Sequence, residues 1–301
     1  MSLLVVGSVA VDSVETPAGS VPEALGGSAS YFAYAASYLT PVRVVSVVGE
    51  DFPDSYLDTL RTRTGIDLSG IKKEPGKSFR WKGRYTGDMN VAETLEVHLN
   101  VFGSFDPDIP VHYRDSKYVF LANGSPVVQR KVLHQIKSPK LVVADTMNFW
   151  IETQRDELIT LLREVDGLVL NDQEALLLTQ DKQLAAAGMK IVDMGPRFVI
   201  VKKGEHGSMM FSQQGVFAFP AYPTLQLVDP TGAGDSFAGG MMGYIASVDN
   251  TDPMNFKRAM AYGTVAASVN VEDFSLRRFE RTTVEDLDER FAKYKEMLRI
   301  D

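Results

Sequence analysis

The chain has 301 residues, of which 45% are hydrophobic, and its formal net charge is -8. A chain of this size and hydrophobicity can bury a sizeable core, which excludes disorder as its main state and fits one large α/β domain. The negative charge argues against broad binding to nucleic acid or to an anionic membrane. Because the chain contains no cysteine, disulfides, thiol nucleophiles and cysteine-ligated zinc are excluded.

The first residues, MSLLVVGSVAVDS, lack a basic region and become polar early, so they indicate a β-strand rather than a signal peptide. No apolar run is long enough to span a bilayer, and we therefore expect a cytoplasmic protein without a membrane partner.

Short β-branched runs then alternate with helical patterns along most of the chain. The predicted strands are 3–6, 42–48, 118–121, 141–144, 168–170 and 198–201. The predicted helices are 28–39, 54–64, 127–136, 156–164, 182–193, 234–246, 253–271 and 284–298. This order is typical of a doubly wound α/β fold with a mainly parallel sheet, in which ligands bind at the carboxyl ends of the strands.

Residues 78–102 interrupt this order with an alternating, aromatic pattern around the turn Thr86-Gly87-Asp88. They indicate antiparallel strands paired with a short piece near 11–21. We expect residues 1–301 to form a single domain with a small antiparallel β lid at about 11–21 and 76–103. The alternative is a simple extension of the main sheet. An exposed lid edge can pair with a second lid, which predicts a homodimer.

The strongest local signal is the string DPTGAGDSF at 229–237, which leads directly into a helix rich in small residues. The start of such a helix presents unpaired backbone N–H groups and favours negative charge. Its glycines allow a phosphate to approach the backbone closely. Asp235, in the first turn, can then accept a proton from an attacking hydroxyl, or it can simply stabilise the helix N-terminus.

DPTGAGDSF resembles the C-terminal signature of the ribokinase-like (PfkB) carbohydrate kinases. The resemblance implies that Asp235 is the catalytic base. It also implies that the backbone of Gly232, Ala233 and Gly234 forms the anion hole for the transferred phosphoryl group, and that Thr231 beside it contacts phosphate.

Two segments near the N-terminus resemble the same family. Gly26 and Gly27 match its di-glycine substrate motif, and Asp12 matches an aspartate that binds substrate hydroxyls. A carboxylate can accept hydrogen bonds from two adjacent hydroxyls, which suits a sugar. Without the resemblance, an ordinary glycine-led helix start explains Gly26 and Gly27 equally well, and a turn residue is the better explanation of Asp12.

Two later segments also match. Asn171 and Glu174 fit the family's N-x-x-E motif, which implies binding of nucleotide phosphate by Asn171 and of Mg²⁺ by Glu174 through water. The alternative is helix capping by the same two residues. Lys202 and Gly204 resemble the strand-to-turn segment at the nucleotide site, although a solvated lysine is the commoner case.

The resemblance implies a ribokinase-like fold and an ATP-dependent kinase that transfers the γ-phosphoryl group to an alcohol of a sugar or sugar-like substrate. ATP and Mg²⁺ are the implied cofactors, and a monovalent cation is left open. The aromatic lid residues Phe79, Trp81 and Tyr85 could stack on a nucleobase, which makes a nucleoside kinase the main alternative. Packing of these residues on the inner face of the lid is the favoured interpretation. A non-catalytic sugar- or nucleotide-binding sensor is the alternative from a different class.

Overall fold

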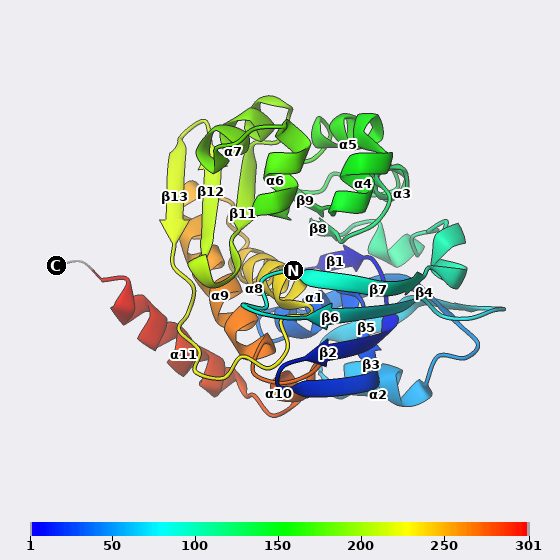
Figure 1. Cartoon of the computed structure of the whole chain (residues 1–301). Helices are drawn as coiled ribbons and strands as arrows, with labels where there is room; N and C mark the ends of the chain where they lie inside the picture. The colour runs from blue at the N-terminus through cyan, green and yellow to red at the C-terminus, as the bar shows by residue number, and fades with distance from the viewer. Residues whose placement is uncertain (1, 300–301) are drawn as a thin grey trace. The chain divides into compact units, whose positions relative to one another are not determined.

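The computed structural model describes residues 2–299 and divides the chain into two compact units (Figure 1). The first unit comprises Met1–Phe105 and Tyr222–Asp301, and the second comprises Asp106–Ala221. The predicted single domain stays a prediction.

Three parallel strands form the sheet of the first unit: β1 (Leu3–Val6), β4 (Val42–Gly49) and β5 (Ile66–Glu74). β1 and β4 were predicted from their continuous hydrophobicity. β5 was not, because Gly70 is its only buried residue and the rest of the strand has an alternating, largely polar sequence. Such a pattern is typical of an edge strand rather than of a central parallel strand.

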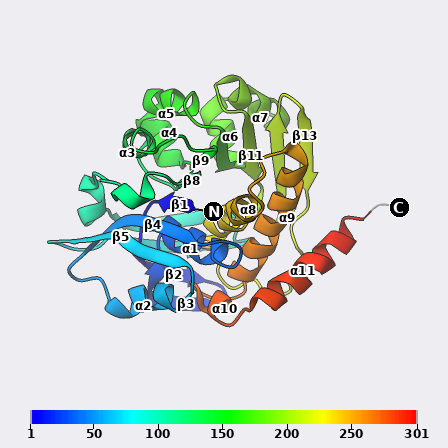
Figure 2. The ribbon, with the colours of Figure 1, turned by 180° about the vertical axis from the view of Figure 1, so that it is seen from behind.

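The helices of this unit are α1 (Ser28–Ala36), α2 (Asp54–Thr62), α8 (Ala233–Val248), α9 (Pro253–Asn270), α10 (Arg277–Glu280) and α11 (Val284–Met297). Helix α8 packs against α1 and α9, and the three lie next to one another in Figure 2. Their close approach depends on small residues, since a Cβ at Gly239 would overlap the Phe32 carbonyl and one at Gly240 would lie 2.6 Å from the Tyr262 carbonyl oxygen. α8 is thereby held along its length.

The predicted lid is a separate four-stranded sheet in the order β3-β2-β6-β7. Its strands are β2 (Ala10–Thr16), β3 (Gly19–Gly26), β6 (Arg80–Tyr85) and β7 (Ala92–His98). The pairs β2–β3 and β6–β7 are antiparallel, while β2 and β6 run parallel. The piece expected near 11–21 is thus a hairpin rather than one strand. One face of the lid carries an apolar cluster that includes Val14, Tyr85 and Phe274.

The second unit is built on the parallel strands β8 (Tyr118–Leu121), β9 (Leu141–Asp145), β10 (Gly167–Asn171) and β11 (Phe198–Lys202), followed by the antiparallel strands β12 (Ser208–Ser212) and β13 (Gly215–Phe219). Its helices are α3 (Pro126–Leu133), α4 (Asn148–Thr153), α5 (Arg155–Leu162), α6 (Asp172–Thr179) and α7 (Leu184–Asp193). All four parallel strands were predicted to within about two residues. Among residues 2–299, no helix combines the length and the hydrophobicity needed to cross a membrane.

Candidate active site

The predicted anion hole, Gly232–Gly234, lies at the start of helix α8, and Thr231–Ser236 is called the anion-hole segment below. Gly232 is the N-cap residue with φ of 76°, a left-handed conformation that glycine adopts without strain. The Ala233 N–H donates to the Pro230 carbonyl at 3.0 Å, so the predicted anion-hole donors that this turn does not use are Gly232 and Gly234. Asp235 lies in the first turn and is half-buried, beside these N–H groups.

The ring of the buried residue Tyr31 packs directly against Gly232 of this segment. A Cβ at Gly232 would overlap the ring of Tyr31, which is 2% exposed. Burial raises the pKa of Tyr31 well above its usual value, and the neighbouring carboxylates of Asp12 and Asp229 raise it further. Tyr31 is therefore a neutral, rigid platform, and no pattern in the sequence identified it.

Asp229 and Tyr85 fix the other side of the segment. The Asp229 Oδ1 accepts from the Thr231 N–H at 2.9 Å, and the hydroxyls of Thr231 and Tyr85 lie 3.4 Å apart. Asp229 was not predicted, although an aspartate two residues before a turn amide is a recognisable local signal. Tyr85 comes from lid strand β6, so the lid contacts the anion-hole segment directly.

Asp12 lies close to this segment, on lid strand β2. Its side chain is 5% exposed, and its carboxyl group occupies the space that a Cβ at Gly26 would need. Gly27 caps helix α1 with φ of 94°, where a Cβ would overlap the Ser8 carbonyl. The structure thus brings together the predicted substrate residues Asp12, Gly26 and Gly27. Burial raises the pKa of Asp12 to about 8, helped by repulsion from Asp229 and Asp235 and opposed by the Gly27 N–H.

Because Asp12 is a predicted substrate residue with a pKa of about 8, we expect acceptor binding to depend on pH. The anion is the stronger hydrogen-bond acceptor for two sugar hydroxyls but the minority form at pH 7, so the acceptor KM should fall about 10-fold between pH 7 and pH 9. Initial rates at saturating Mg-ATP measure this, with Asp12→Asn as the non-titrating reference. A wild-type KM that does not change with pH would contradict the role of Asp12.

The pH dependence of thermal stability provides a second test of the protonation state of Asp12. The folded chain keeps a proton on Asp12 that the unfolded chain releases above pH 3.8. The stability due to neutral Asp12 is therefore complete below that pH and is lost as the pH rises through about 8. Asp12→Asn should raise the melting temperature more at pH 9 than at pH 6.

In the second unit, three adjacent parallel strands end in polar residues at one edge of the sheet. Asp145, Asn171 and Lys202 are the last residues of β9, β10 and β11, and Asn171 pairs with Lys202 in register. The Lys202 Nζ lies 3.9 Å from Asp145 Oδ1. Burial raises the pKa of Asp145, and Lys202 opposes that shift. The carboxyl edge of this sheet is the expected place for a ligand.

Asn171 and Glu174 form a helix capping box at the start of α6. The Glu174 N–H donates to Asn171 Oδ1 at 2.8 Å, and the Asn171 N–H donates to Glu174 Oε2 at 2.7 Å. The capping interpretation is therefore confirmed, and it leaves Glu174 Oε1 outside the box. Burial raises the pKa of Glu174 to about 7, with Lys202 opposing the shift and Asp145 adding to it. Burial disfavours the charged form of Glu174, and a nearby cation would stabilise that form. This fits binding of Mg²⁺ through water.

Gly204 begins a single 3-10 turn, Gly204–His206, just after β11. Its φ is 54°, and the turn is closed by the Lys203 N–H, which donates to the Gly207 carbonyl at 2.7 Å. Gly204 therefore lies at the same sheet edge as Lys202. Its contact with a nucleotide stays a prediction.

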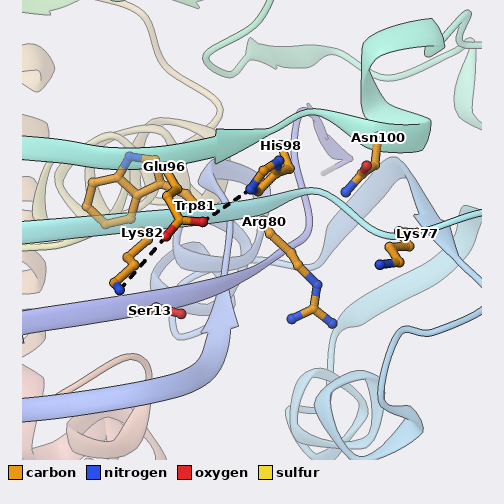
Figure 3. A pocket seen from close by; sticks show the side chains of 8 residues that line it. All are labelled: Ser13, Lys77, Arg80, Trp81, Lys82, Glu96, His98 and Asn100. Atoms are coloured by element: carbon orange, nitrogen blue, oxygen red, sulfur yellow. Dashed lines mark hydrogen bonds and ion pairs between the residues drawn. The ribbon is translucent and has the colours of Figure 1, made fainter.

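The lid also contains a cavity of about 440 Å³, on the face opposite Asp12 (Figure 3). Ser13 lines it, and successive residues of a strand point to opposite faces. Several of its charged residues are paired: Lys82 lies 3.9 Å from Glu96, His98 lies 3.3 Å from Glu96, and Arg80 binds both Glu23 and Asp51. Trp81 also borders this hollow, whereas the predicted substrate residues Asp12, Gly26 and Gly27 do not line it.

Comparison with known proteins identifies the family to which the chain belongs. The model of the pfkB family carbohydrate kinases matches residues 2–282. The chain belongs to this family. It is 31% identical to the cytidine kinase of Thermococcus kodakarensis over 248 residues, which are 80% of this chain and 87% of that protein.

Solved structures of PfkB-family kinases show the same fold. A provisionally assigned ribokinase II from E. coli with ATP and Mg²⁺ has a TM-score of 0.79 at 20% identity, covering 97% of this chain and 99% of that one. The Burkholderia thailandensis nucleoside kinase with inosine has a TM-score of 0.78 at 20% identity, covering 97% and 98%.

As a PfkB-family kinase, the chain has a ribokinase-like fold and is an ATP-dependent phosphotransferase that acts on a small sugar-like molecule. ATP and Mg²⁺ are the general requirement of such kinases, as the E. coli structure illustrates.

Proposed function

We propose that the acceptor of this PfkB-family kinase is a nucleoside, held by its ribose hydroxyls at Asp12 and by its base at Trp81. The observation that carries this is the register of the lid, where Asp12 on β2 is paired with Trp81 on β6. Paired residues on adjacent strands project from the same face. A sugar at Asp12 would thus share a face of the lid with the indole, which extends over Gly83 toward Thr94 on β7 and would be reached by a planar group that spans strand β6.

The other lid aromatics are already engaged. Phe79 stacks on Phe102 with ring centroids 5.5 Å apart, and Tyr85 is buried in the inner lid cluster. Packing of the inner lid face is thus the role of Tyr85, and in part that of Trp81, which borders the same cluster. Trp81 remains half-buried, with its Nε1–H donating to Thr94 Oγ1 at 3.3 Å, which fixes the ring edge. A held indole with a partly open face is suited to stacking.

In the proposed reaction, Asp235 accepts the proton of the attacking hydroxyl. The transition state of phosphoryl transfer is loose, so its main need is stabilisation of negative charge. The N–H groups at Gly232 and Gly234 and the hydroxyl of Thr231 meet that need at the positive end of the α8 dipole.

Asn171, Lys202 and Gly204 are the proposed nucleotide contacts, and Glu174 the proposed Mg²⁺ contact through water. Glu174→Gln keeps the capping box, which accepts either residue, but removes the charge. We expect the Mg²⁺ concentration for half-maximal rate to rise about 10- to 100-fold, as for other outer-shell ligands. Titration with Mg²⁺ at fixed ATP measures it, and the exposed Glu152→Gln is the control. Equal Mg²⁺ requirements in wild type and Glu174→Gln would remove Glu174 from the site.

Three further proposals have simple tests. A monovalent cation is proposed as an activator at Asp229, whose Oδ2 is buried and makes no hydrogen bond of normal geometry to any residue in the described range 2–299. Assays in K⁺, Na⁺ or tetramethylammonium would show whether turnover depends on the cation.

A homodimer through the lid is tested by light scattering. A cytoplasmic location is expected because ATP is the donor, and cell fractionation tests it.

The acceptor is tested with Mg-ATP and a panel of nucleosides, free pentoses, hexoses and inositol. Nucleoside-dependent release of ADP that free ribose does not support would establish the proposal. Turnover of a free sugar alone would replace it with a sugar kinase. ATP binding without turnover across the panel would instead support a sensor.

A further inference from the structure

One buried side chain joins the two ends of the anion-hole segment. The Asn270 Nδ2 donates to the Thr231 carbonyl at 2.7 Å, and its Oδ1 accepts from the Ser236 hydroxyl at 3.0 Å. Asp235 lies between these anchors and next to Ser236. Asn270 is 1% exposed, so water does not compete for either bond.

The backbone that carries Asn270 is itself fixed. Asn270 is the last residue of α9, which packs closely on α8. A Cβ at Gly263 would lie 2.7 Å from the Phe237 carbonyl oxygen, which shows how little space separates the two helices. The amide of Asn270 is therefore delivered to the segment by rigid helix packing rather than by a loop.

The Thr231 bond controls the direction of an anion-hole donor. The Thr231 carbonyl and the Gly232 N–H belong to one planar, trans peptide unit, in which they point in opposite directions. By holding the carbonyl on one side, Asn270 aims the Gly232 N–H to the other side. Gly232 has no Cβ and a left-handed φ, so little else in its own residue resists rotation of that peptide.

We propose that Asn270 is a positioning residue for phosphoryl transfer, which fixes the Thr231–Gly232 peptide plane and the Ser236 end of the same turn. It contacts neither substrate, and it acts through the N–H groups and the carboxylate that do. This inference rests on the proposed function. Small losses of alignment in such a site are costly, since a displacement of about 1 Å can lower the rate about 100-fold.

The test compares Asn270→Ala and Asn270→Asp with Thr264→Ala. Thr264 is a buried residue of the same helix whose hydroxyl donates to the Met260 carbonyl at 3.0 Å, so its loss reproduces the cost of a buried hydrogen bond away from the segment. Both Asn270 variants should lower kcat about 10- to 100-fold while the KM values for ATP and acceptor change less than about threefold. Thr264→Ala should keep the wild-type kcat.

Asn270→Asp keeps the volume and can still accept from the Ser236 hydroxyl but lacks the amide donor to the Thr231 carbonyl, and thermal melting of each variant shows that the fold is retained before kcat is compared. Binding of ADP, Mg²⁺ and fluoroaluminate, a mimic of the transferred phosphoryl group, should weaken in parallel with kcat while ATP binding does not. Wild-type kcat in both variants would overturn the inference, as would a loss shared by Thr264→Ala. Wild-type ADP release is the separate test of the proposed function.

Discussion

Asp235→Asn should fold normally, bind ATP and acceptor, and lose at least about 100-fold in kcat, the low end for removal of a general base. Asparagine has the same shape and keeps a hydrogen-bonding oxygen, but it cannot take a proton from the attacking hydroxyl. Asp235 is placed for this in the first turn of α8, beside the N–H groups at the helix start. Because the substitution leaves the backbone unchanged, the loss should appear in kcat rather than in the KM values.

The matched control for this variant is Asp249→Asn at the opposite end of the same helix. Asp249 is the C-cap residue with φ of 51°, a conformation that asparagine adopts as readily as aspartate. The Asp249→Asn variant should keep wild-type turnover. Near-normal kcat in Asp235→Asn would show that another group accepts the proton, and an equal loss in the control would show that charge on α8 is what matters.

Gly232→Ala should lower kcat about 100- to 1,000-fold, the range for losing one donor of an oxyanion hole. Two effects combine there: an added Cβ would overlap the Tyr31 ring, and φ of 76° is strained for alanine. Tyr31 is buried and cannot move aside, so the peptide before Gly232 must rotate and withdraw its N–H from the phosphoryl position.

Gly87→Ala separates strain from function. Gly87 lies in the lid turn with φ of 60°, and a Cβ there would meet no atom within 4 Å. It carries the same kind of backbone strain as Gly232→Ala without a clash or an anion-hole donor. Steady-state kinetics and thermal melting of both variants separate the effect of backbone strain from the loss of the anion-hole donor. Similar kcat values in the two variants would mean that Gly232 serves the fold only.

The predictable parts of the site are those encoded by short stretches of sequence. DPTGAGDSF determines a turn and a helix start within nine residues, and Asn171 with Glu174 determines a capping box within four. The hydrophobic runs of β8 to β11 likewise predicted the strands whose ends carry Asn171 and Lys202. Local backbone chemistry decides such features, so a single sequence is sufficient.

The remaining parts depend on contacts between distant segments. Trp81 lies beside Asp12 only because β2 and β6 pair in a particular register, and a shift of one residue would turn it to the other face. Asn270 ends an ordinary helix and gains its role from the packing of α9 on α8. Tyr31 is part of an apolar helix whose pattern shows burial but not the glycine above it.

The most direct test of the account is release of ADP from Mg-ATP with cytidine, inosine or free ribose as acceptor, by the wild type and by Asp235→Asn. The account predicts nucleoside-dependent turnover in the wild type, no turnover with free ribose, and a loss of at least about 100-fold in the variant. Equal turnover in the two proteins, or turnover that free ribose alone supports, would contradict it.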